Sequence, residues 1–185
     1  MSSHPRKTST GLALKDCALS LKASIQSAFG RNLQARQTLR ELLTLRQSYL
    51  APDHKSRASA QIALAETYLD GNIVDRMQAD ALLSEAQLIL IKHNGAMQKQ
   101  VARVLHIRGR LHTSMADKNR AHTFHQAAET VYERIRPLSF ERVANLRELA
   151  HAQAAIGLYM EAKATRKTAE ELNRILLLQS VRRRY

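Results

Sequence analysis

Apolar residues recur with helical spacing along almost the whole chain after residue 12. In the stretch "LSLKASIQSAF", Leu19, Ala23, Ile25 and Ala28 fall on one broad face of a helix. The stretch "LRELLTLRQSYL" repeats the same spacing, and no alternating run of β-branched residues reaches the length of a strand. The pattern therefore predicts an all-α protein.

Residues that interrupt helices divide this pattern into segments. Prolines occur in "LAPDHK" and "RIRPLSF", where the missing amide proton ends a helix, and glycines follow apolar runs in "YLDGN" and "KHNGA". Asp75 and Asp117 stand where an N-cap is expected. The breaks predict about eight helices in four hairpins. The expected pairs are 12–29 with 33–50, 57–69 with 76–92, 97–114 with 118–135, and 140–155 with 159–180.

Small residues recur at fixed offsets from the turns of these hairpins. In "LRELAHAQAAIGLYMEA", Gly157 is followed five residues later by Ala162 and seven residues after that by Ala169. Gly30 and Ala35 in the first hairpin have the same offset. Small side chains let the two helices of a hairpin approach closely, and stacked hairpins share one core. The chain is therefore expected to be a repeat of about 42 residues.

The motif "LxxLAxxxAxxGxYxEA" in residues 146–162 resembles the tetratricopeptide repeat, and the resemblance extends over residues 16–176. It implies a right-handed α-solenoid, TPR-like, of about four antiparallel helix hairpins with a C-terminal capping helix. Tyr159 is expected to fill space between helices. The helices lack the usual aromatic opener and the period exceeds 34 residues, so the sequence is similar to longer-period variants of this superfamily.

The length of 185 residues and the hydrophobic content of 44% suit one folded domain. We expect a disordered basic N-terminal tail over residues 1–11, a single repeat domain over 12–180 and a basic C-terminal tail over 181–185.

Cys17 is the single cysteine, so the sequence allows no intrachain disulfide. No apolar run is long enough to cross a membrane. A cytoplasmic location is predicted, with the nucleus and a mitochondrial transit peptide as alternatives.

The net charge of +13 indicates an anionic partner. The charge is uneven: residues 54–100 are neutral, whereas residues 142–185 hold nine Lys and Arg against four acids. The partner is either an acidic segment of another protein or a nucleic acid, and improved solubility is the alternative explanation.

Catalytic motifs are missing: the sequence has no phosphate-binding glycine loop, no HExxH motif and no nucleophile elbow. His122 and His125, with Glu129 on the same helix face and His112 on the neighbouring helix, form a candidate metal set. Paired histidines on a solvated helix are the more ordinary interpretation. We therefore predict a protein that is not an enzyme and needs no cofactor.

The resemblance implies which residues contact a partner, because the first helix of each hairpin lines the inner groove in this superfamily. Glu66 and Asp70 would make the early part of that groove acidic. The basic residues that would line its later part are Arg103, His106, Arg110, Arg147 and His151. Their spacings of three and four residues place them on single helix faces, where arginine can grip carboxylates of an acidic peptide.

The C-terminal sequence "NRILLLQSVRRRY" combines an apolar run with a basic end. Residues 175–178 either cap the stack or form an apolar patch for a partner or a second copy of the chain, giving a homo-oligomer. Arg182, Arg183 and Arg184 are candidates for contact with anions or nucleic acid, and an unstructured tail is the alternative.

These observations favour a non-catalytic scaffold or adaptor that binds an acidic peptide or protein in a basic concave groove. One alternative is a nucleic-acid or ribonucleoprotein-binding accessory protein that uses the basic C-terminal half. Another is a regulatory module that senses a ligand or a peptide.

Overall fold

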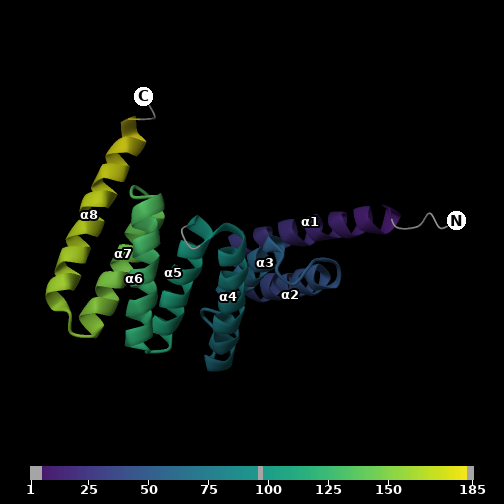
Figure 1. The fold of residues 1–185 in the computed structure, drawn as a ribbon, viewed down its shortest axis with the longest axis horizontal. Coiled ribbons are helices and arrows are strands. Elements are labelled where there is room, and N and C mark those ends of the chain that lie inside the picture. The colour runs from purple at the N-terminus through teal and green to yellow at the C-terminus, as the bar shows by residue number, and fades with distance from the viewer. Residues whose placement is uncertain (1–5, 96–97, 183–185) are drawn as a thin grey trace. The chain divides into compact units, whose positions relative to one another are not determined.

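A computed structural model describes residues 6–95 and 98–182, and these residues form eight α-helices (Figure 1). The helices are α1 (Arg6–Ala28), α2 (Asn32–Tyr49), α3 (Lys55–Glu66), α4 (Ile73–Asn94), α5 (Lys99–Ser114), α6 (Lys118–Ile135), α7 (Phe140–Ala155) and α8 (Tyr159–Arg182). The chain forms two compact units, residues 1–89 and 90–185. The prediction of an all-α fold is confirmed.

The helix ends agree with the predicted hairpins to within a few residues, except at the two ends of the chain. Helix α1 begins at Arg6, so it includes residues 6–11 of the predicted tail. Once a helix has formed, each further residue adds a hydrogen bond without a new nucleation cost, and no proline follows Pro5 in this stretch. Helix α8 likewise continues to Arg182, past the predicted end at residue 180.

In the first unit, a buried arginine joins three consecutive helices. Arg46 of α2 binds both carboxylate oxygens of Asp16 in α1, at 2.6 and 2.9 Å, and also donates to the backbone oxygen of Ser56 in α3. This bidentate pair lowers the pKa of Asp16. Helix α4 is tied to α3 by a hydrogen bond of 2.6 Å from Gln61 Nε2 to Glu85 Oε2.

In the second unit, helices α5 to α8 pack through small side chains. Ala121, Ala128, Ala162 and Ala169 are all almost fully buried on the second helices of the two hairpins. They let α6 approach α5, and α8 approach α7, closely enough for leucines of the first helices to fill the remaining space. The predicted packing role of Ala162 and Ala169 is confirmed.

Glycine serves the turns in two different ways. Gly30, Gly95 and Gly157 have φ of +68°, +78° and +89°, the left-handed conformation expected after a helix. Gly71 does not have a positive φ. Its backbone instead passes so close to the carboxylate of Asp75 that a β-carbon at Gly71 would collide with that carboxylate.

The predicted N-cap at Asp75 is wrong, because Asn72 supplies the cap to the amide of Asp75. The predicted cap at Asp117 is confirmed by its bond to the amide of Arg120.

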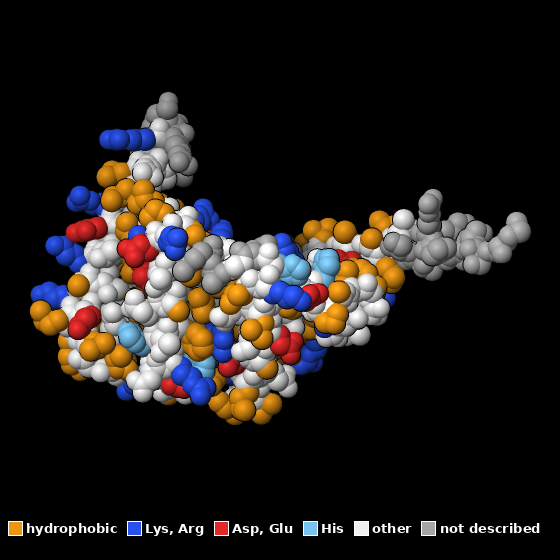
Figure 2. All heavy atoms as spheres, in the orientation of Figure 1, with side chains coloured by type: hydrophobic (Ala, Val, Ile, Leu, Met, Phe, Trp, Pro, Cys, Tyr) orange, Lys and Arg blue, Asp and Glu red, His pale blue; other side chains and the backbone are white. Residues whose placement is uncertain are grey.

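Helix α8 exposes much of its apolar surface. Tyr159, expected to fill space between helices, is 70% exposed because it begins the helix on the side away from α7. Leu172 and Leu176 are half-buried, whereas Ile175, Leu177, Leu178 and Val181 are exposed. Figure 2 shows hydrophobic side chains near the C-terminal end of this helix, next to Lys and Arg. Within residues 6–95 and 98–182, no helix combines the length and apolarity needed to cross a bilayer.

Candidate functional site

Helices α5 and α7 are the first helices of consecutive hairpins, and they contact each other in the second unit. Near their first turns, Lys99 Nζ of α5 lies 2.9 Å from Glu141 Oε1 of α7. The hydrogen bond from Lys99 lowers the pKa of Glu141. Further along, His106 Nδ1 lies 3.0 Å from Asn145 Oδ1. These two links hold the helices side by side.

Four of the five predicted groove residues are exposed. Arg103 and Arg110 lie on α5, seven residues apart, and Arg147 and His151 lie on α7, four residues apart. Residues spaced in this way share one side of a helix. We call these four residues the basic face.

His106, the fifth predicted residue, is half-buried, and one of its ring nitrogens is bonded to Asn145. Its ring also meets the ring of His125 edge to face, with the centroids 5.4 Å apart. His106 therefore joins the helices beneath the basic face and is less accessible to a partner than the four exposed residues.

Asn145 is the centre of a buried polar cluster that sequence analysis did not find. Its side-chain oxygen lies 3.0 Å from Nδ1 of both His106 and His125, and its amide nitrogen donates to the backbone oxygen of His125. Because the amide fixes the oxygen toward the two rings, both Nδ1 atoms must carry a proton. The signal was present in the sequence, since Asn145 lies four residues before the buried Leu149 and thus on the inward side of α7.

Gly109 makes room for this cluster. A β-carbon at Gly109 would lie 2.5 to 2.7 Å from three ring atoms of His125. The imidazole of His125 is fully buried against α5 at this position. Gly109 thus permits close approach of α5 and α6, a packing role distinct from the turn roles of Gly30 and Gly157.

Burial sets the charge of the two histidines. It lowers the pKa of His125 to about 4 and also lowers the pKa of His106, because the charged imidazolium would lose hydration inside the protein. The hydrogen bonds to Asn145 oppose this shift in both cases. His125 is therefore neutral at pH 7, and the arginines supply the positive charge of the basic face.

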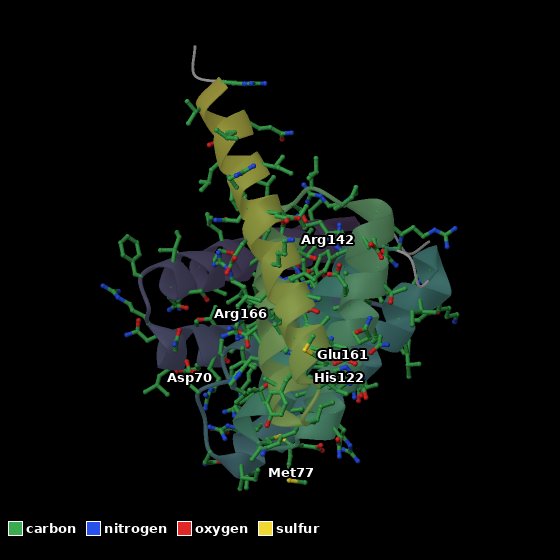
Figure 3. All side chains as sticks on the ribbon, turned by 90° about the vertical axis from the view of Figure 1, so that its left-hand side faces the viewer. Asp70, Met77, His122, Arg142, Glu161 and Arg166 are labelled. Atoms are coloured by element: carbon green, nitrogen blue, oxygen red, sulfur yellow. The ribbon has the colours of Figure 1, made fainter. Side chains whose placement is uncertain are left out.

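A second buried group lies between α6 and α7, at the start of α7, where Figure 3 labels Arg142. Arg142 Nε donates to Glu129 Oε1 at 2.7 Å, and its other nitrogens reach Glu133 Oε1 and the backbone oxygen of Pro137. Burial raises the pKa of Glu129, while Arg142 opposes that shift. Sequence analysis placed Glu129 with His122 and His125, but the side chains of Glu129 and His125 are directed to Arg142 and Asn145 instead.

The other predicted contact residues lie elsewhere. Arg182 is exposed at the end of α8, while Arg183 and Arg184 lie outside the described residues. In the first unit, Glu66 is half-buried and Asp70 is exposed.

No protein-family model matches the sequence, and no curated protein sequence matches it. Among solved structures, BtubC (BKLC) from P. vanneervenii matches with a TM-score of 0.79 and 19% identity. The match covers 87% of this chain and 64% of BtubC, so the chain spans less than two thirds of that protein's length.

A putative kinesin light chain from Podosopora anserina, with nearly identical TPR-like repeats, also matches. Its structure gives a TM-score of 0.67 at 21% identity, over 88% of this chain and 74% of that one. A single-substitution variant of the same protein gives a TM-score of 0.69 at 21% identity, over 87% and 74%. The chain therefore has a TPR-like helical repeat fold, as the sequence predicted.

Proposed function

We propose that the protein is a non-catalytic adaptor whose basic face binds an acidic segment of a partner protein. TPR-like repeat folds commonly mediate protein–protein interaction, and the proposal assigns that role to α5 and α7. The observation that carries it is the exposure of Arg103, Arg110 and Arg147 on two contacting helices.

The contrast with other arginines of this chain supports the assignment. Arg46 and Arg142 are buried and bonded to carboxylates of neighbouring helices, so they stabilise the fold. Arg110 and Arg147 of the basic face are exposed to solvent. Guanidinium groups bind carboxylates in bidentate geometry, which suits an extended segment rich in Asp and Glu.

Glu148 limits which segments fit the basic face. It is half-buried on α7, directly after Arg147, and its charge acts on His106. A ligand carboxylate close to Glu148 would meet a like charge. We therefore expect acidic residues of the partner to bind near Arg103, Arg110 and Arg147, at separated points along the segment.

The experiment compares two charge-reversed variants of the intact chain. Arg110→Glu with Arg147→Glu alters the basic face, and Arg166→Glu with Arg174→Glu makes the same change of net charge on exposed positions of α8. The probe is a fluorescein-labelled peptide of alternating Glu and Gly, titrated by fluorescence anisotropy. We expect at least tenfold weaker binding for the first variant and less than threefold for the second, with unchanged helicity by circular dichroism. Equal losses in both variants would show general charge attraction and overturn the assignment.

The distribution of charge on α8 does not favour the nucleic-acid alternative. Lys167 Nζ lies 3.9 Å from Glu171 Oε1, and Glu161 and Glu170 are also exposed among the basic residues of this helix. Acidic side chains at these positions would repel a phosphate backbone. Tight binding of a single-stranded RNA that is lost in the α8 variant and retained in the α5–α7 variant would reverse this preference.

A further inference from the structure

Helix α1 carries apolar residues on two opposite faces, and only one of them is covered. Asp16 and Gln26 face α2, where they bind Arg46 and Thr38. Ala23, on the same face, is 3% exposed. The sequence pattern assigned Ile25 to the face of Ala23, but Ile25 is 48% exposed, because it lies on the side turned away from α2.

The uncovered residues form a continuous seam, which we call the outer stripe. Leu14 and Leu21 are 73% and 64% exposed, and Phe29 at the end of the helix is 75% exposed. Together with the exposed Ala18 and Ile25, they follow one another at spacings of four, three, four and four residues. Figure 2 shows hydrophobic side chains gathered along this helix. Steps of three and four residues keep side chains on the narrow seam by which one helix packs against another.

One edge of the outer stripe is basic, whereas the other carries Cys17 and Ser24. Lys15 and Lys22 are exposed and follow Leu14 and Leu21 directly, so both lie along the same edge of the stripe. Asp16 is the one acidic residue in the sequence of α1, and it is bonded to Arg46 on the opposite face. This edge of the stripe therefore carries two lysines, and the acidic residue Glu41, which belongs to α2, lines the same hollow as Lys15.

This charge distinguishes among occupants of the stripe. A second copy that paired stripe to stripe would bring its own Lys15 and Lys22 to the seam, where like charges repel. A helix whose apolar seam is bordered by Glu or Asp would bury the same leucines and pair with Lys15 and Lys22.

We propose that the outer stripe of α1 is a docking surface for an amphipathic helix of a partner protein, with carboxylates bordering its apolar seam. The surface belongs to the first unit and shares no residue with the basic face. An experiment can therefore support one proposal and overturn the other.

The test uses a synthetic three-heptad helical peptide with Leu in the seam and Glu at both borders, labelled with fluorescein. A matched peptide carries Lys at the borders. In anisotropy titrations with the intact chain, we expect saturable binding of the Glu peptide and at least tenfold weaker binding of the Lys peptide. The variant Leu21→Ser with Ile25→Ser should lose at least tenfold in affinity. Leu88→Ser, at an exposed position of α4, is the matched control and should bind as the unaltered chain does.

A charge swap makes the test independent of folding. Lys15→Glu with Lys22→Glu changes only exposed side chains, and it should reverse the preference so that the Lys peptide binds more tightly than the Glu peptide. The basic face is proposed to bind acidic segments as well, so the titrations are repeated in the background Arg110→Glu with Arg147→Glu, where the outer stripe alone should still bind the Glu peptide and Leu21→Ser with Ile25→Ser should still weaken that binding at least tenfold.

Several results would overturn the proposal. One is the absence of saturable binding, another is equal binding of the two peptides, and a third is loss of binding only when the basic face is altered. Self-association in sedimentation velocity that Leu21→Ser abolishes would assign the stripe to a second copy. Binding to phosphatidylcholine–phosphatidylserine vesicles that the same change abolishes would assign it to a lipid surface.

Discussion

The buried imidazole of His125 makes the stability of the second unit depend on pH in a predictable direction. Its pKa is about 4 in the folded protein, against 6.5 for an exposed histidine. Between these two values the unfolded chain binds a proton that the folded chain does not. Stability therefore falls as the pH drops from about 6.5 toward 4, and it is fully present above 6.5.

The size of the effect follows from the two pKa values. At pH 5, protonation favours the unfolded state roughly thirtyfold, and at pH 7 by less than a factor of about two. The difference corresponds to about 2 kcal/mol of unfolding free energy between pH 7 and pH 5. His106 adds to the effect, because burial lowers its pKa as well. Glu129 opposes it, since its raised pKa lets the folded state take up a proton more readily on acidification.

The substitution His125→Asn isolates the contribution of His125. Asparagine places an amide close to the position of Nδ1, so the bond to Asn145 is kept while the titrating ring is removed. The variant should be less stable at pH 7, because the ring leaves a cavity beside Gly109. Its loss of stability between pH 7 and pH 5 should nevertheless be smaller than that of the unaltered chain by about 2 kcal/mol. Glu129 is present in both proteins, so its contribution to the pH dependence cancels when the variant is compared with the unaltered chain.

Urea unfolding at pH 7 and pH 5, followed by circular dichroism, gives the unfolding free energy of each protein at both pH values. These values yield the stability at pH 7 and the loss of stability between pH 7 and pH 5. Gln126→Asn, at an exposed position of α6 beside His125, is the control and should leave the pH dependence of the unfolding free energy unchanged. Proton resonances of the His125 ring provide a direct check, since they should stay constant from pH 7.5 to 5.5. A ring that titrates near pH 6.5 in the folded protein, or an unchanged pH dependence in His125→Asn, would refute the reasoning.

Three further substitutions test the packing of the fold. Gly109→Ala should destabilise the chain by about 1–3 kcal/mol in urea unfolding, because the new methyl group meets the His125 ring, and His125→Ala should relieve most of that cost in the double variant. Gly157→Ala should cost about 1 kcal/mol or more in thermal unfolding, because φ is +89° there, and an unchanged melting temperature would contradict this. Arg142→Met should cost about 3–5 kcal/mol by leaving a buried carboxylate unpaired, and adding Glu129→Gln should restore a large part of it.

The fold was predictable because helix ends and close packing depend on local patterns. Gly30, Gly157 and Asp117 mark turns and caps through backbone conformation and short side-chain bonds, both of which depend on a few neighbouring residues. Ala162 and Ala169 recur at offsets fixed by the hairpin. These features need no knowledge of distant contacts.

The polar interior was not predictable in the same way. The position of Asn145 on the inward side of α7 could be read from the sequence, but its partners could not, and both Asn145 and Arg142 are buried because groups on α5 and α6 satisfy them. Ala23 and Ile25 are two residues apart and therefore lie on opposite sides of α1, so the predicted shared face was wrong. Which of the two sides is buried depends on the position of α2, which the periodicity of α1 does not contain.

The buried polar groups also bear on how the basic face is built. His106 and Asn145 join α5 to α7 directly, and Arg142 joins α7 to α6, so the position of α7 is fixed from two sides. Directional hydrogen bonds fix how one helix is placed along another more strictly than leucine packing does, since each bond is satisfied at one position only. The exposed arginines of α5 and α7 are consequently held at fixed separations by groups that do not themselves face solvent. A partner that binds Arg110 and Arg147 together would meet a surface organised in advance, which lowers the entropy lost on binding.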